Sequence, residues 1–425
     1  MNAHPTQTRP PKQKQRAGLL TLAALGVCGC GQAGLEDVRS SEARLDGKDV
    51  PAEAVKDQTR RNTTFALALY QQLRRPGENL FFSPLSITTA LAMTYAGAAG
   101  QTAQQLEQVL RIDATSHAAL NVIDQALNSR GQGQGGQAEA FRLTTVSALF
   151  GQRGYPYLPP FLSTLARFYG AGLRALDFAA APEPARATIN DWVAGRTEGK
   201  IPALLPEGSI TGDTRLVLTN AVSFKAAWLN RFDRGATANG DWIGDGGTTR
   251  APLMQRRATF NYASVAGVDV VELPYQGQEV SLLVLAPPAG QLGAFEQSLS
   301  EARLAELLGQ LQPQDMILTM PRFRVESERR LKEPLMALGL RDALLAGAAD
   351  LSGMDGTRRL YLSEVHHKAV IDLNEDGTEA AAATGGIVSE VSLPPLVTIN
   401  RPFLYLIRDK ATGAVIFLGR LASPQ

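Results

Sequence analysis

The segment at residues 375–395 (EDGTEAAAATGGIVSEVSLPP) constrains this chain more than any other feature. It is rich in small side chains, and it separates two stretches with the apolar, β-branched composition of core strands, VHHKAVIDL and LVTINRPF. Loops of this length inside a compact domain are usually functional. Four successive alanines fit an exposed helix or a flexible linker equally well, because alanine is the best helix former. The pattern alone leaves these alternatives open.

Length and charge narrow the class of protein. The chain has 425 residues, which is enough for one large domain. Lys and Arg total 42 and Asp and Glu total 41, so the net charge is +1. A balance this even provides no strong field to gather nucleic acid or another polyanion. The only two cysteines lie near the start of the chain, so no disulfide can stabilise its body.

The first thirty residues have the composition of a targeting signal. Basic residues at 12–16 precede an apolar stretch at 17–27, which is too short to span a bilayer. The cysteines that follow resemble the acylation site of a bacterial lipoprotein, with residues 1–29 as the signal peptide and Cys30, or alternatively Cys28, as the lipidated residue. A plain secretory signal is the alternative. Either way, we expect an extracytoplasmic protein, secreted or lipid-anchored at the cell surface or in the periplasm.

Residues 30–58 are polar, small and charged. This composition predicts a disordered tether between the N-terminal signal segment and the folded domain. A helical pattern begins near Thr59, with Phe65, Leu69 and Leu73 spaced four residues apart. Strand and helix patterns then follow one another without regular alternation, which indicates an α+β fold. The stretch RATINDWVAGRTEGKIPALL predicts a helix that ends near its second glycine, Gly199.

Three motifs resemble cofactor- or metal-binding sites, but each lacks a feature that such a site requires. The G-x-G-x-x-G match at 131–136 lies in a polar, low-complexity loop without a preceding strand. The EF-hand-like start at 372–377 lacks its bidentate glutamate, because Ala383 stands at the twelfth position. His366 and His367 are adjacent, so on a strand they point to opposite faces and cannot easily chelate one metal. We therefore expect no metal, no cofactor and no enzyme activity.

Five segments across residues 59–423 resemble, in order, the serpin family of serine protease inhibitors. They are LFFSPLSITTALAMTYAGA, INDWVAGRTEGKI, LTNAVSFKAAW, SEVHHKAVIDLNEDGTEAAAAT and INRPFLYLIRDKATGAVIFLGRL. The resemblance implies a serpin domain at 59–425, with three β-sheets, about eight or nine helices and an exposed reactive-centre loop at about 375–395. It also implies a monomer whose partner is a serine protease. No basic cluster marks a heparin site in this chain.

The resemblance assigns a mechanism to this loop. Cleavage lets its first half insert into the main sheet as an extra strand, so that the inhibitor acts as a suicide substrate. On a strand, Thr378, Ala380, Ala382 and Thr384 would face the core, and all are small. The implied hinge comprises Glu375, Gly377, Thr378, Glu379, Ala380, Ala381, Ala382 and Ala383. An intact hinge favours inhibition; a non-inhibitory, surface-binding lipoprotein with the same fold is the alternative.

In the family the bait bond lies about fourteen residues past the hinge glycine, so the resemblance implies that it is Val391–Ser392 here. A valine suits the shallow apolar pocket of an elastase- or subtilisin-like protease. If the bait bond lies one residue earlier, Glu390 enters the protease pocket instead, and the target is a glutamate-specific protease. The protease would form a covalent acyl-enzyme complex with the inhibitor. The resemblance further implies a polar cluster beneath the sheet, formed by Ser83, Ser86, Asn220 and His367, and a set at the top of the sheet, formed by Trp228 and an ion pair between Arg322 and Glu375.

Overall fold

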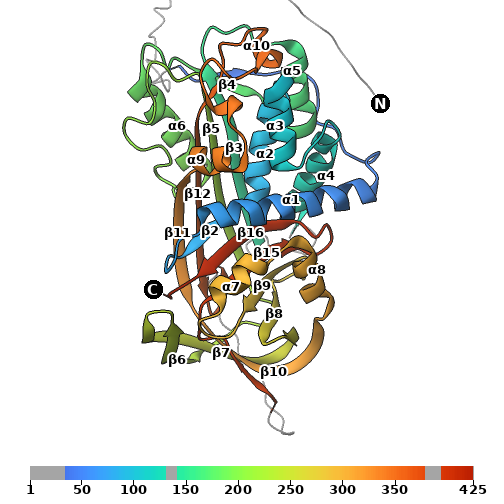
Figure 1. Ribbon diagram of the computed structural model, residues 1–425, viewed down its shortest axis with the longest axis vertical. Helices are drawn as coiled ribbons and strands as arrows, with labels where there is room; N and C mark the ends of the chain where they lie inside the picture. The colour runs from blue at the N-terminus through green and yellow to red at the C-terminus, as the bar shows by residue number, and fades with distance from the viewer. Residues whose placement is uncertain (1–33, 131–140, 379–393, 425) are drawn as a thin grey trace, which may run out of the picture.

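The computed structural model describes residues 34–130, 141–378 and 394–424, and it shows an α+β fold built on one long sheet (Figure 1). This sheet has seven strands in the order β1-β4-β3-β5-β13-β12-β11. Its strands are β1 (Glu36–Val38), β3 (Phe141–Gln152), β4 (Leu173–Leu176), β5 (Leu216–Ala227), β11 (Phe323–Arg330), β12 (Leu362–Asn374) and β13 (Gly377–Thr378). We call it the main sheet.

The second sheet follows the order β14-β10-β7-β8-β9-β15-β16-β2, and β6 pairs with β7 beside this path. Its strands are β2 (Leu80–Phe82), β6 (Asp233–Gly244), β7 (Gly247–Val265), β8 (Val268–Pro274), β9 (Val280–Ala286), β10 (Gln312–Pro321), β14 (Leu396–Thr398), β15 (Phe403–Asp409) and β16 (Val415–Leu421). Among the described residues, two of the three sheets that the resemblance implies are continuous with each other. The 19-residue strand β7 pairs with β6 through its first half and with β8 through its last residues, which joins two sheets into one.

The described helices are α1 (Ala52–Leu73), α2 (Pro84–Tyr95), α3 (Gly100–Leu110), α4 (Ser116–Ser129), α5 (Pro159–Thr164), α6 (Pro182–Arg196), α7 (Leu292–Ser298), α8 (Glu301–Gly309), α9 (Lys332–Leu338) and α10 (Ser352–Asp355), with a π turn η1 (Leu165–Tyr169) and a 3-10 turn η2 (Asp342–Leu344). Among these residues, no helix combines the length and the apolar character needed to cross a membrane. The helix expected to end near Gly199 ends at Arg196, because Glu198 and Gly199 both adopt positive φ.

Helices cover both faces of the main sheet. Helix α2 begins at Pro84 behind the N-cap Ser83, whose hydroxyl accepts from the Ser86 N–H. It lies against the face that carries Asn220, whose side chain receives a bond from Ser86. Helix α6 packs through Val193 on Ala221, which points to the opposite face. Strand β5 is therefore covered on both sides, and eleven of its twelve residues are buried.

The expected disordered tether at 30–58 is wrong over its described part. Residues 36–38 form β1 and pair with β4 at the edge of the main sheet, and α1 begins at Ala52. Between them, the Leu45 N–H donates to the Arg167 carbonyl at 2.8 Å, and Arg44 forms an ion pair with Asp124 at 2.7 Å. These partners lie far along the chain, so a segment without periodicity gave no sign of them. We call residues 34–51 the N-terminal arm.

Candidate functional site

The start of the loop segment is already part of the main sheet. Strand β13 lies between β5 and β12 and runs antiparallel to both, so that Thr378 faces Ala226 on one side and Leu373 on the other. Beyond β13, the two flanking strands pair directly with each other in parallel. We call this direct pairing, from Leu216 to Ser223 on β5, the seam. The strands β5 and β12 are thus separated at one end, where β13 lies between them, and paired with each other along the seam. We call the position of β13 its seat.

Gly377 fits this seat because it has no side chain. Its φ of +147° lies in a region that other residues rarely adopt. A Cβ atom at this position would lie 2.1 Å from the Ala226 carbonyl oxygen and 2.7 Å from the Ala227 Cα. Both contacts are with backbone, which cannot move aside without shifting β5. Glycine is therefore required where the chain turns into the sheet.

Thr378 faces the core, as strand alternation predicts. It is fully buried, and its Oγ1 lies 3.0 Å from the hydroxyl of Tyr275. Burial raises the pKa of Tyr275, so this phenol stays protonated and available as a partner. The shared contact satisfies two polar groups that would otherwise be buried without a partner. The hinge residues Glu379, Ala380, Ala381, Ala382 and Ala383 lie outside the described residues.

Trp228 holds the turn that precedes β13. Its indole N–H donates to the Asn374 carbonyl at 2.8 Å, and its backbone N–H donates to the Asp376 carbonyl at 2.9 Å. The indole stacks on Tyr275 with ring centroids 4.6 Å apart and an interplanar angle of 7°. Tyr275 therefore links Trp228 to Thr378, a role that the sequence did not indicate.

Glu375 and Arg322 lie close together, with Oε1 and Nη1 3.7 Å apart. The carboxylate is almost buried, whereas half of the Arg322 side chain is exposed, so this pair contributes little on its own. The same oxygen accepts a shorter bond of 2.7 Å from Thr237, and Arg234 binds Asp376 beside it. Sequence reasoning missed Thr237 and Arg234, because they come from β6, which carried no recognisable pattern.

The four residues assigned to the cluster beneath the sheet lie together. Asn220 Oδ1 accepts from Ser86 Oγ at 2.7 Å and lies 2.6 Å from His367 Nδ1. The Ser83 backbone N–H donates to His367 Nε2 at 3.1 Å. Asn220 also donates to Ser147 on β3 at 2.7 Å, which the sequence did not indicate. The cluster thus joins α2 to β3, β5 and β12 across the seam.

The hydrogen bonds fix the state of His367. Because Nε2 accepts the Ser83 N–H, the ring proton must lie on Nδ1, where it donates to Asn220. Complete burial lowers the pKa of His367 from 6.5 to about 3, so the ring is neutral at neutral pH. A second proton on Nε2 would point at the Ser83 N–H, which is itself a donor, so protonation would break this hydrogen bond. This histidine therefore acts as a neutral connector between the helix and the seam.

The remaining assigned residues fall outside the described part of the chain. These are the bait residues Val391 and Ser392, the alternative Glu390, and the cysteines Cys28 and Cys30. Among the described residues, no group of three or more His, Cys, Asp or Glu side chains is arranged to hold a metal ion. What the described geometry offers is a main sheet that already accepts two residues of a long segment between its central strands.

Comparison with known proteins agrees with this geometry, and the chain belongs to the serpin family. The family model described as "Serpin (serine protease inhibitor)" matches residues 60–424. Human leukocyte elastase inhibitor is 37% identical over 379 residues, which cover 85% of this chain and 98% of that protein. Human serpin B3 is 38% identical over 384 residues, with the same coverage.

Solved structures show the same fold. Uncleaved ovalbumin has a TM-score of 0.78 and 28% identity, and the match covers 86% of this chain and 99% of ovalbumin. Maspin has a TM-score of 0.79 and 25% identity, covering 88% of this chain and all of that chain. The family is one of serine protease inhibitors, which supports the expectation that this protein inhibits a serine protease.

Proposed function

We propose that this protein traps a serine protease as a suicide substrate. The observation that carries the proposal is the seat of Gly377 and Thr378 between β5 and β12. A segment whose first residues already pair with both strands can continue into the sheet if the seam opens. The small residues that follow, Ala380 and Ala382 in particular, suit the buried positions of such a strand.

The chemistry of the first step belongs to the protease. Its serine attacks the Val391 carbonyl, the Val391–Ser392 bond breaks, and Ser392 leaves with a free amine, so that Val391 remains joined to the protease as an ester. The segment that ends at Val391 is then free of its second attachment and extends β13 along the seam. This movement carries the protease away and distorts its active site before water can hydrolyse the ester.

Valine at the bait position suits an elastase- or subtilisin-like protease, because its small β-branched side chain fills a shallow apolar pocket. Similarity to an elastase inhibitor supports this preference. If Glu390 occupies the pocket instead, the target is a glutamate-specific protease. Intact-mass analysis of the released fragment after incubation with each class of protease identifies the bond that is cut.

The substitution Thr378→Arg tests insertion. An arginine at this buried position would leave a charge without a partner, so we expect the seat to stay empty and the variant to be cut as an ordinary substrate. The matched control is Thr248→Arg on β7, where the threonine is exposed. On a denaturing gel, the wild-type protein and the control should form a stable complex with elastase or subtilisin. A stable complex with Thr378→Arg would contradict insertion at this seat.

The alternative, a non-inhibitory binding protein of the serpin fold, predicts simple cleavage without a complex for the wild-type protein as well. The same gel therefore separates the two proposals. A hydrolase would instead turn over small esters or peptides, which we do not expect of the pure protein.

We further propose that the chain is exported and anchored by a lipid on Cys30, with Cys28 as the alternative. Support comes only from the basic and apolar pattern that precedes the cysteines. Metabolic labelling with a fatty acid in a bacterial host tests this. Loss of label in Cys30→Ser and its retention in Cys28→Ser would support the first choice. An unlabelled wild-type protein that is still exported indicates a plain secretory signal.

A further inference from the structure

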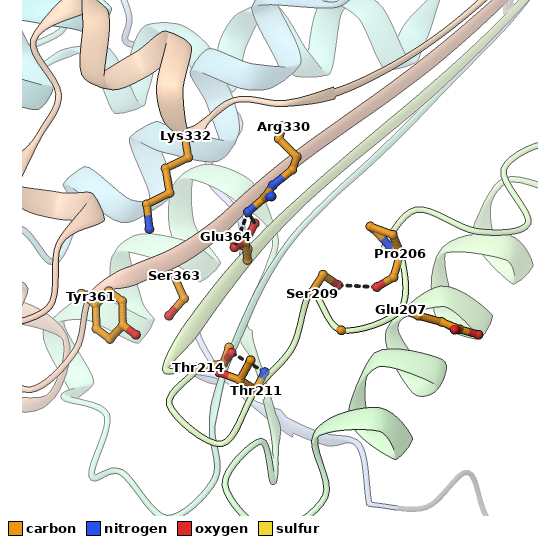
Figure 2. Close-up of a pocket in the computed structure, with 11 residues that line it drawn as sticks. Pro206, Glu207, Ser209, Thr211, Thr214, Arg330, Lys332, Tyr361, Ser363 and Glu364 are labelled. Atoms are coloured by element: carbon orange, nitrogen blue, oxygen red, sulfur yellow. Dashed lines mark hydrogen bonds and ion pairs between the residues drawn. The ribbon is translucent and has the colours of Figure 1, made fainter.

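A cavity of about 280 Å³ lies at the opposite end of the seam from β13 (Figure 2). The loop that follows α6 forms one wall, and the start of β12 forms another. The third wall is the junction of β11 and α9, from which Arg330 and Lys332 extend. The site described above does not use this cavity.

The register of β13 predicts what reaches this end of the seam. Thr378 pairs with Ala226 on β5, and an antiparallel strand moves one residue down β5 for each residue that it advances. Val391 is thirteen residues beyond Thr378, and Asp213 is thirteen residues before Ala226. Continued in this register, the inserted strand therefore brings Val391 to the level of Asp213. The hydroxyl of Tyr361, which lines the cavity, donates to the Asp213 carbonyl at 3.0 Å.

Several hydrogen-bond donors that line the cavity have no acceptor among the described residues. Lys332 has no ion-pair or hydrogen-bond partner for its ammonium among the described residues, and it points toward Tyr361 and Ser363 in Figure 2. Ser363 Oγ accepts from the Arg215 N–H at 3.1 Å, and Thr214 Oγ1 accepts from the Thr211 N–H at 3.0 Å. Each hydroxyl therefore keeps its own proton for donation.

Two carboxylates line the cavity: Glu207 extends away from Lys332 on the opposite wall (Figure 2), and Glu364 is already paired. Glu364 binds Arg330 at 3.0 Å and also lies 3.0 Å from His366 Nε2. Its negative charge is thus balanced within the wall and does not neutralise Lys332. The Lys332 ammonium and the hydroxyl groups of Ser363 and Thr214 are donors of the kind that bind a carboxylate.

We propose that this cavity is a carboxylate site that receives the cut end of the loop segment, with Lys332 as its ion-pair partner. The proposal rests on the proposed function, because the end arrives only if the strand inserts. While the protease remains attached, Val391 is an ester without charge. Hydrolysis adds water across the ester bond: the serine oxygen takes one proton, the other passes to solvent, and Val391 gains a carboxylate next to that of Glu390. The site therefore stabilises the inserted form that remains after hydrolysis.

The test uses the full chain after cleavage, with the cut at 391–392 verified by intact mass. Its unfolding rate is measured in guanidinium for the wild-type protein, Lys332→Gln, Lys332→Arg and the control Lys410→Gln, an exposed lysine at the β15–β16 turn. We expect cleaved Lys332→Gln to unfold about tenfold faster than cleaved wild type, which is the loss of one charge-assisted hydrogen bond. Lys332→Arg should recover most of this loss, and the uncut forms should unfold alike.

The outcomes separate the two proposals. If cleaved wild type unfolds no more slowly than uncut wild type, the strand does not insert and the proposed function fails. If cleavage slows unfolding equally in wild type and Lys332→Gln, insertion stands and the carboxylate site is refuted. Stabilisation of the uncut protein by inorganic phosphate, lost in Lys332→Gln, would show a general anion site and would also overturn the assignment to the cut end.

Discussion

Acidification from pH 7 to pH 5 should destabilise the native fold through His367. The ring is fully buried and its pKa falls from 6.5 to about 3, whereas the unfolded chain keeps the ordinary value. The unfolded state therefore binds the proton more tightly, and this contribution to stability is complete above pH 6.5 and is lost as the pH falls toward 3. Between pH 7 and pH 5 about 1.5 pH units of this range are crossed, which corresponds to about 2 kcal/mol.

A variant that cannot titrate isolates this effect. In His367→Gln, the amide can donate to Asn220 and accept the Ser83 N–H, so the cluster can keep its connections without a titrating ring. His117 also has a lowered pKa, about 4, because of burial, but it contributes equally to both proteins.

The assay is urea unfolding of wild type and His367→Gln at pH 7 and pH 5, extrapolated to water. We expect the free energy of unfolding of wild type to fall by about 2 kcal/mol more than that of the variant. Equal losses in the two proteins would refute the assignment of a buried, neutral His367. If the free energy of unfolding falls more in His367→Gln than in wild type, the predicted direction of the His367 contribution is wrong.

Three further substitutions test other contacts. Gly377→Ala should lower the free energy of unfolding by about 2–3 kcal/mol in urea, because its methyl group meets the β5 backbone, whereas Gly246→Ala, with nothing within 4 Å, should change it by less than about 0.5 kcal/mol. Trp228→Phe keeps the stacking on Tyr275 but removes the bond to the Asn374 carbonyl, and should cost about 1 kcal/mol in the same assay. Arg44→Ala should leave global stability within about 1 kcal/mol while making the N-terminal arm more sensitive to limited proteolysis, and unchanged cleavage of the arm would contradict its packing.

The sequence was informative where function depends on local chemistry. The resemblance, combined with strand alternation, implied that Thr378 faces the core after a turn at Gly377, and the structure shows Gly377 at positive φ with Thr378 buried. The proximity of Ser83, Asn220 and His367 followed from resemblance, since residues so far apart in the chain have no shared periodicity.

The sequence failed where structure depends on long-range pairing. Three residues of β1 are too few to show strand alternation, and their partner β4 lies over 130 residues away, so the N-terminal arm looked unstructured. Tyr275 looked like part of a hairpin, and only the packing of β8 and β9 beside the seat of β13 reveals its contacts with Thr378 and Trp228. The sequence also could not show that the Lys332 ammonium lacks a partner among the described residues, because only the fold shows which charges are paired.

The N-terminal arm also determines how an anchored molecule would face its surroundings. Strand β1 lies beside the end of β4 that pairs with Phe150, which is far from the end of β5 that holds β13. Six residue steps lead from Cys30 to Glu36, so a lipid on Cys30 would keep this edge within about 22 Å of the bilayer. The twelve residues of β5 span about 40 Å, so the end of β5 that holds β13 would lie on the side of the molecule away from the bilayer. A short anchored segment would thus turn the seat of β13 outward, toward proteases that approach the cell.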